Sequence, residues 1–353
     1  MKQYTYLAVP LIIASACTAG DGGSPTVLEP GLASARVTAA SISVTVLPSL
    51  GGSSTARAIN DDQVIVGSSN GLPVKWTLVA GSWQVQALQS TSGAAEDITE
   101  QFGEIVGSSG GSVVLWSGGV RETVGAGFPT AMNESELIVG EVQSPTDGNP
   151  ARAWTRSGSV WVVHVLPREA GVTDGYYGPT DINDDGVIVG NGGRAGGGGT
   201  HAIKWVRNAT TGEWDPAVPL DDVAANNLGG AAAIVGPDIV GSLLRCTASR
   251  CSHDPYHWSL AGPGIGSLGS QDAYAEGLNA QKWIVGTFLY RGSHAFVWTP
   301  SSGTIRDLGT PKGFQGAHAY DINSPTGTRA ASQAVGEGIS NRRANVAVLW
   351  TVP

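Results

Sequence analysis

The chain repeats one short phrase seven times. Each copy is an Ile-Val-Gly sequence or a close variant, followed nine to seventeen residues later by a tryptophan. The pairs are Gly67 with Trp76, Gly107 with Trp116, Gly140 with Trp154, Gly190 with Trp205, Gly241 with Trp258, Gly286 with Trp298, and Gly336 with Trp350. Successive glycines are 40, 33, 50, 51, 45 and 50 residues apart. A period of 40–50 residues with strand-like content is typical of β-propellers and other β-arrays.

Composition supports strands rather than helices. Glycine accounts for 51 of 353 residues, and charged residues make up 14% of the chain, against about 25% in an average protein. Valine, isoleucine, threonine and serine are plentiful, as expected for many short strands joined by tight turns. No long window shows the apolar period of about 3.6 residues that marks an amphipathic helix. We therefore expect an all-β fold.

The first repeat has the content of one propeller blade. Its expected strands cover residues 55–59, 64–66, 74–78 and 83–88, and residues 60–63 (Asn-Asp-Asp-Gln) have the chemistry of a turn. Four strands within about 40 residues make one blade. Seven such repeats predict a seven-bladed β-propeller over residues 42–353.

The two ends of the propeller sequence complement each other. The sixth repeat has a strand after its tryptophan, at residues 304–309, whereas the seventh stops at Pro353 soon after Trp350. A matching strand precedes the first repeat at residues 43–48. We expect residues 42–48 to pair beside residues 346–351 and complete the last blade, because closing the ring removes two unpaired sheet edges.

The repeated residues also suggest local roles. The glycine either allows a neighbouring backbone to approach closely or adopts positive φ. The tryptophan is expected to pack between neighbouring blades, although an exposed tryptophan can instead stack on sugars. An asparagine stands seven residues before the glycine in four repeats and earlier in the last, at Asn60, Asn133, Asn183, Asn279 and Asn323.

The N-terminus predicts export. Lys2 precedes an apolar stretch over residues 7–16, which is too short to cross a membrane. The small residues at positions 14–16 fit a cleavage site for a signal peptide, residues 1–16. The Cys17 that follows makes the segment resemble a bacterial lipoprotein signal, with Cys17 lipidated and residues 17–41 a flexible tether. The alternatives are secretion with Cys17 free or removed, and a plain hydrophobic start.

The remaining cysteines fit the same compartment. Cys246 and Cys251 are close in sequence, and an exported chain can join them in a disulfide. Two free thiols are the alternative. A zinc site is less favoured, because no second pair of ligands at suitable spacing accompanies them beyond His253 and His257.

The sixth repeat contains residues 275–279 (Ala-Glu-Gly-Leu-Asn), then residues 283–286 (Trp-Ile-Val-Gly), then residues 294–298 (His-Ala-Phe-Val-Trp). This pattern resembles the HAF-repeat family of probable extracellular bacterial proteins. Residues 201–205 of the fourth repeat share it, whereas the second and fifth repeats are degenerate. The resemblance covers residues 50–353. It implies an exported location and a repeated β-fold, and it carries over no catalytic residue.

Three acids occupy similar places in their repeats. If the first strand of each blade lines a central channel, Asp97, Asp181 and Asp321 converge there, where they could serve hydrolysis or bind a cation. The alternative is solvated turn residues. Asp181, Asn183 and Asp185 also match the start of a calcium loop, but the later acidic ligands are missing and a hairpin turn is favoured.

The sequence favours a binding role without naming a ligand. It contains no His-Glu-x-x-His and no Walker motif, no cofactor is expected, and a net charge of −9 disfavours nucleic acid as a partner. We expect a non-catalytic propeller at the bacterial envelope or cell surface that binds a protein or glycan partner, with a membrane contact through lipidated Cys17. The alternatives are a polysaccharide hydrolase or lyase and a structural or adhesive surface protein.

Overall fold

Seven four-stranded antiparallel sheets form a closed ring, a seven-bladed β-propeller. The computed structural model describes residues 41–143, 148–193, 199–220, 228–246, 250–262, 264–269, 272–326, 330–341 and 343–353. The predicted signal peptide, Cys17 and almost all of the predicted tether lie outside these ranges. Every regular element in the described residues is a strand, and none of these residues belongs to a helix able to span a membrane.

Each of the first four blades is built from consecutive strands. Blade 1 contains β2 (Ser54–Ile59), β3 (Ile65–Ser69), β4 (Leu72–Val79) and β5 (Ser82–Ala87). Blade 2 contains β6 (Ala94–Ile98), β7 (Ile105–Ser109), β8 (Ser112–Ser117) and β9 (Val120–Ala126). Blade 3 contains β10 (Phe128–Met132), β11 (Ile138–Glu141), β12 (Ala151–Ser157) and β13 (Val160–Val165). Blade 4 contains β14 (Tyr177–Ile182), β15 (Ile188–Gly193), β16 (Thr200–Trp205) and β17 (Val218–Pro219).

Blades 5 and 6 follow the same order. Blade 5 contains β18 (Leu228–Val235), β19 (Asp238–Cys246), β20 (Cys251–Ser259) and β21 (Gly266–Ser267). Blade 6 contains β22 (Ala273–Leu278), β23 (Ile284–Leu289), β24 (Ser293–Trp298) and β25 (Ile305–Asp307). The first strands, β2, β6, β10, β14, β18 and β22, are innermost, because each contacts the first strands of its neighbours around the ring.

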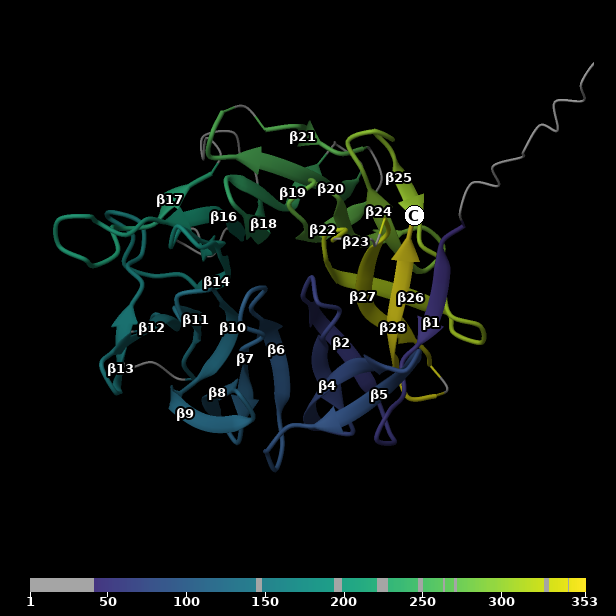
Figure 1. Ribbon diagram of the computed structural model, residues 1–353. Coiled ribbons are helices and arrows are strands. Elements are labelled where there is room, and N and C mark those ends of the chain that lie inside the picture. Colours follow the sequence, from purple (N-terminus) through teal and green to yellow (C-terminus); the bar gives the residue numbers. More distant parts are fainter. Residues whose placement is uncertain are drawn as a thin grey trace, which may run out of the picture. The chain divides into compact units, whose positions relative to one another are not determined.

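Blade 7 joins the two ends of the propeller. It contains β26 (Gly316–Ile322), β27 (Ser332–Ile339) and β28 (Val346–Val352), with β1 (Ser43–Val46) as its fourth strand. The register places Ser43 opposite Thr351 and Val46 opposite Val348. Figure 1 shows purple β1 beside yellow β28. The predicted closure, seven blades completed by the N-terminal strand, is therefore confirmed.

The repeated glycine is required by close backbone approach. In each blade the pairing between the first and second strands shifts by one residue, a β-bulge, as between Ala56 and Ala58 of β2. The glycine faces this bulge, and a Cβ added to Gly67 would lie 2.0 Å from the Thr55 carbonyl oxygen. Across the seven glycines the corresponding distances are 1.9–2.2 Å. None of the seven has positive φ, so close approach explains the residue.

The hydrophobic core is divided into seven clusters, one between each pair of neighbouring blades. Each cluster contains one repeat tryptophan, so that Trp76 packs with Leu47, Ala347 and Leu349 at the junction of blades 7 and 1. The Trp76 indole N–H also donates to the Pro48 carbonyl at 2.7 Å. The expectation that these tryptophans pack between blades agrees with these contacts, since a blade buries its faces only against its neighbours.

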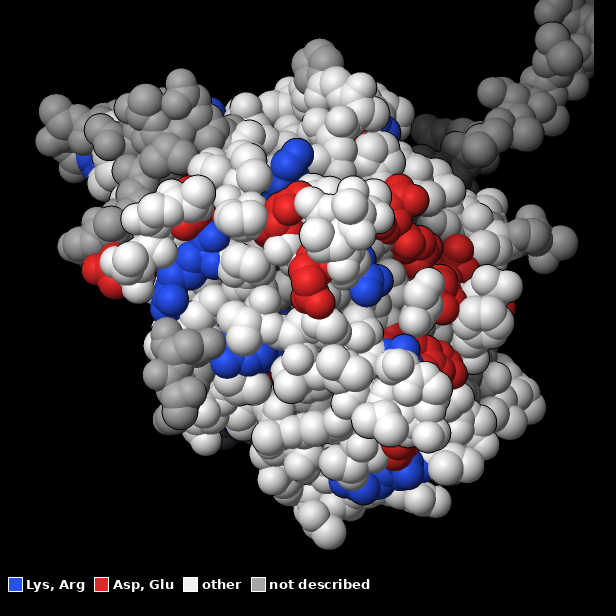
Figure 2. Space-filling model, turned by 90° about the vertical axis from the view of Figure 1, so that its left-hand side faces the viewer, with Lys and Arg blue, Asp and Glu red and all other residues white. Residues whose placement is uncertain are grey.

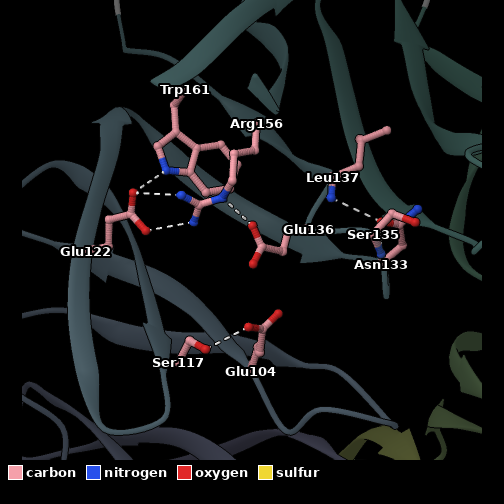
Figure 3. Close-up of polar contacts among 9 residues, drawn as sticks. All are labelled: Glu104, Ser117, Glu122, Asn133, Ser135, Glu136, Leu137, Arg156 and Trp161. Carbon is pink, nitrogen blue, oxygen red and sulfur yellow. Dashed lines mark hydrogen bonds and ion pairs between the residues drawn. The ribbon is translucent and has the colours of Figure 1, made fainter. Parts of the chain in front are cut away.

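A rim contact joins blades 2 and 3 outside their shared core (Figure 3). The Arg156 guanidinium in β12 donates to both carboxylate oxygens of Glu122 in β9, at 3.1 and 2.7 Å, and to Glu136 at 2.5 Å. Its Cζ lies 4.4 Å from the centre of the Trp161 ring, and the Trp161 indole donates to Glu122 at 2.8 Å. This bidentate pair holds the pKa of the Glu122 carboxyl below its usual range.

Candidate functional site

The channel inside the ring has two mouths of different character. The first strand of every blade runs in the same direction along the channel, so the ends of these strands share one mouth and their beginnings share the other. We call the first the acidic mouth; its cavity of ≈ 250 Å³ is lined by Asp61, Asp97, Glu100, Glu134, Asp181, Asp184 and Asp321. We call the other the tyrosine mouth; its cavity of ≈ 730 Å³ is lined by Tyr176, Asn191, Ser242, Tyr274 and Glu276.

The three aspartates predicted to converge do line one cavity, and each links two blades. The Asp321 carboxylate accepts the backbone N–H of Ile322 in its own blade at 2.7 Å and that of Ile59 in blade 1 at 2.8 Å. Asp97 accepts in the same way from Ile98 and from Met132 in blade 3, and Asp181 from Ile182 and from Ile234 in blade 5. One oxygen of each carboxylate therefore bonds within its own blade, and the other links that blade to the next.

These aspartates alternate with small residues around the ring. The residue that follows the bulge is Asp in blades 2, 4 and 7, and it is Ala58, Ala131 or Ala233 in the blades that donate to them. Six of the seven blades thus form three Asp–Ala pairs. In the remaining blade, blade 6, the residue after the bulge is Gly277. A Cβ on Gly277 would lie 2.5 Å from the Tyr320 carbonyl oxygen. The aspartates thus serve as hydrogen-bond acceptors between neighbouring blades.

A second set of acids, in the turns that follow the first strands, takes part in a chain of hydrogen bonds around the acidic mouth. The backbone N–H of Ser324 donates to Asp61, that of Asp61 to Glu100, that of Glu100 to Glu134, and that of Glu134 to Asp184, at 2.6–3.1 Å. Each bond passes from one blade to the next, from blade 7 through blades 1, 2 and 3 to blade 4. Every acid that lines the acidic mouth therefore accepts at least one backbone hydrogen bond.

The turn asparagines form a third set of links. The Asn133 side chain donates to the Asn183 carbonyl at 3.0 Å, and the Asn323 side chain donates to the Asn60 carbonyl at 3.1 Å. Blade 5 departs from the pattern, because β18 joins β19 through the short turn at Gly236 and Pro237. The sequence suggests Asn227 as the counterpart in this irregular repeat, and Asn227 lies outside the described residues.

Burial raises the pKa of all three inner aspartates. It raises the pKa of Asp181 to about 7 and that of Asp321 to about 6, and the backbone N–H bonds oppose the shift. The pKa of Asp97 lies well above its usual value, because burial and the nearby Asp181 charge both disfavour ionisation. The three values move in the same direction, whereas an acid/base pair in an enzyme has pKa values pushed apart.

These shifts predict that acid stabilises the ring. The folded chain binds protons at Asp181 and Asp321 more tightly than the unfolded chain, whose aspartate pKa is near 3.8. This stabilisation is complete below that value and is lost as the pH rises through about 6 to 7. We expect a lower melting temperature at pH 8 than at pH 5, measured by circular dichroism. The Asp181→Asn/Asp321→Asn double variant cannot ionise at these positions and keeps one of the two acceptor oxygens at each, so it should reduce the difference. An unchanged pH dependence would contradict this.

The calcium candidate does not form a joint site. Both Asp181 oxygens accept backbone N–H groups in the channel, and the Asn183 oxygen accepts from Val187 within its turn. The Asn183 amide donates to the Gly236 carbonyl in blade 5 at 2.7 Å, and Asp185 is exposed on the turn. Within the described residues no cluster of three or more His, Cys, Asp or Glu side chains could hold a metal ion. The motif is a hairpin turn.

Each repeat histidine lies beside an acid, and the two cysteines form a disulfide. His201 Nε2 lies 2.8 Å from a Glu169 oxygen, and His294 Nδ1 lies 3.2 Å from an Asp307 oxygen. Cys246 and Cys251 are joined in a disulfide that links the facing ends of β19 and β20. Leu244 and His253 of this hairpin line the tyrosine mouth.

The tyrosine mouth combines aromatic rings with unpaired polar groups. The His253 and Tyr274 rings pack together with centroids 4.2 Å apart, and Tyr176 is 48% exposed with its hydroxyl donating to Glu141. Within the parts of the chain that the structure describes, Asn191 and Glu276 have no side-chain hydrogen bond or ion pair. Burial raises the pKa of Glu276 to about 7, although Arg57 draws it down. Asn191 and Glu276 therefore differ from Thr130, Thr180 and Tyr176 at the same mouth, whose hydroxyls are hydrogen-bonded.

Sequence reasoning missed Tyr176, Asn191, Tyr274 and Glu276. A signal was present for Glu276, because it is the bulge residue of its blade, between Ala275 and Gly277. The equivalent residues are Arg57, Glu96, Thr130, Thr180, Ala232 and Tyr320. Arg57, Thr130, Thr180 and Glu276 each lie ten residues before the glycine of their repeat, so aligning the repeats at their glycines brings these four positions together.

The chain matches no protein-family profile, and no curated protein was found to be related in sequence. It is similar in structure to a puromycin-hydrolyzing peptidase of Mycobacterium tuberculosis, with 13% identity, a TM-score of 0.45, and coverage of 87% of this chain and 50% of the peptidase. It is also similar to YCF48 bound to D1 peptide, with 10% identity, a TM-score of 0.47, and coverage of 89% and 97%. The chain spans half the length of the peptidase. These likenesses concern the arrangement of strands and assign no activity.

Proposed function

We propose that this protein is an exported, lipid-anchored, non-catalytic propeller that binds a protein or glycan partner at its tyrosine mouth. The observation that carries the proposal is the contrast between the two mouths. Every acid of the acidic mouth accepts a backbone N–H, although the buried Glu134 Oε2 makes no hydrogen bond, whereas the side chains of Asn191 and Glu276 at the tyrosine mouth make no hydrogen bond at all within the described residues. Polar groups left without partners in a cavity favour a ligand that supplies the missing hydrogen bonds.

The charge distribution supports a partner other than nucleic acid. Figure 2 shows one side of the ring, where Lys and Arg are scattered among Asp and Glu and most of the surface carries neither. A phosphate backbone is bound by clustered Lys and Arg, which that side does not present. The described lining of the tyrosine mouth likewise contains neither Lys nor Arg.

The binding role predicts that ligand affinity depends on one mouth only. We would screen purified peptides, neutral glycans and charged glycans for a rise in melting temperature of the wild-type protein. The rise should disappear in the Asn191→Ala/Glu276→Ala double variant and persist in Asp184→Asn, a matched change at the acidic mouth. If the ligand-induced rise in melting temperature disappears in Asp184→Asn and persists in the double variant, the ligand binds at the acidic mouth and the proposal is wrong. Turnover of a bound glycan would contradict the non-catalytic role.

The anchor predicts covalent lipid on Cys17. Cells that express the full chain would be labelled with a clickable fatty-acid analogue, and the purified protein examined for label. We expect strong labelling of the wild type and none of Cys17→Ser, because the thiol is the attachment atom. Equal labelling of both proteins would refute the anchor while leaving the binding proposal standing.

A further inference from the structure

The tyrosine mouth has the size and construction of a small-ligand site. Its ≈ 730 Å³ cavity lies within the range of about 300–1,000 Å³ that is usual for such sites. Three glycines of β18 and β19, Gly229, Gly230 and Gly241, form part of its wall. A Cβ on Gly230 would lie 1.8 Å from the Asn191 side-chain oxygen, so the Asn191 amide is accommodated by the absence of a side chain there.

Its hydrogen-bonding groups come from several blades. Asn191 belongs to blade 4, Ser242 to blade 5 and Glu276 to blade 6, and none of them makes a side-chain hydrogen bond to the described chain. The hydroxyls of Thr130 and Thr180 donate to carbonyls of the next blade and keep oxygen lone pairs available. An amide, a carboxyl group and hydroxyls together can donate and accept, so they match a ligand rich in hydroxyl groups.

Aromatic rings provide the apolar part of the wall. Tyr274 and His253 form a packed pair with ring planes 31° apart, and Tyr176 is 48% exposed. Planar rings beside polar groups suit ligands with one apolar face and polar edges. A pyranose ring has both features, whereas an extended peptide typically binds by pairing with an exposed strand edge.

The charge of the mouth excludes anionic ligands. Glu276 lines the cavity, and Glu141 and Asp272 stand behind Tyr176 and His253. Arg57 pairs with Glu96 at 3.7 Å and packs against Tyr320, and it is not part of the described lining of the cavity. A phosphate or carboxylate ligand would meet Glu276, and the described lining of the cavity contains no Lys or Arg to pair with it.

We propose that the tyrosine mouth binds a neutral carbohydrate chain through Asn191 and Glu276, with a sugar ring against the Tyr274–His253 pair. This rests on the proposed binding function and narrows it to one ligand class. Because the sugar hydroxyls bond to a carboxyl group in either protonation state, the bond needs the polarity of Glu276 and not its charge.

Isothermal titration calorimetry with purified full-length protein tests the proposal. The probes are neutral oligosaccharides of glucose, galactose, mannose and N-acetylglucosamine, matched uronate and glucosamine oligomers, and unrelated peptides. We expect a neutral oligosaccharide to bind, Glu276→Gln to retain its affinity within about threefold, and Asn191→Ala and Tyr274→Ala to weaken it at least tenfold. Circular dichroism melts of each variant establish that the ring is intact.

The alternative outcomes are distinguishable. A glucosamine oligomer that binds, and that loses affinity in Glu276→Gln, would show an ammonium ligand and overturn the neutral-sugar proposal. A peptide whose affinity falls in Asn191→Ala would also overturn it and leave the binding function intact. Failure of every probe to bind the intact protein would overturn the neutral-sugar proposal. Binding that is insensitive to all tyrosine-mouth variants would count against both proposals.

Discussion

Removing residues 42–48 is expected to lower the melting temperature of the propeller by about 10 °C or more. The deletion takes away β1, the fourth strand of blade 7, and with it Leu47, which is 2% exposed in the cluster between blades 7 and 1. Losing a buried leucine alone costs about 2–5 kcal/mol. The deletion also removes Pro48, whose carbonyl accepts the Trp76 indole N–H.

The matched control is a chain that begins at residue 42, which keeps β1 and all of its partners. Comparing the two by thermal denaturation separates the effect of the strand from that of the preceding segment. Should the deletion fail to express, Leu47→Ala tests the same cluster with a smaller loss. Superimposable melting curves for the control and the deletion would show that β1 does not hold the ring closed.

Gly67→Ala is expected to destabilise the protein more than an ordinary glycine substitution. The new Cβ would lie 2.0 Å from the Thr55 carbonyl oxygen and 3.1 Å from the Ala56 Cα, both backbone atoms of the bulged strand. Relief requires moving β2 away from β3, and forced overpacking of this kind costs about 1–3 kcal/mol. At about 2 °C for each kcal/mol in a large domain, we expect a fall of about 2–6 °C in melting temperature.

Gly262→Ala provides the comparison within the same chain. Nothing lies within 4 Å of a Cβ at Gly262, and its φ is not in the left-handed region. Its melting temperature should therefore stay within about 1 °C of the wild type, as is usual for surface substitutions away from special features. Equal effects at the two glycines would mean that the bulge, and not its steric contact, accounts for the repeated residue.

The acidic mouth illustrates how position can be predicted while role cannot. Asp97, Asp181 and Asp321 each stand two residues before the turn residue of their repeat, which predicted that they would converge if the first strand of each blade lined the channel. Their use as inter-blade acceptors depends on backbone N–H groups of Met132, Ile234 and Ile59. Those donors are 35, 53 and 262 residues away in sequence, and only the closed ring brings them within hydrogen-bond distance.

By itself, the sequence determined the number of blades, their four-strand order and the way the ring closes. These features follow from local repetition, since each glycine, tryptophan and turn acts mainly within its own blade or on the adjoining one. Only the tertiary structure decided which polar side chains are hydrogen-bonded within the fold and which have no partner among the described residues. Asn191 and Glu276 come from different blades and are brought to one cavity by curvature around the channel. That juxtaposition is a property of the assembled ring, and no spacing along the chain encodes it.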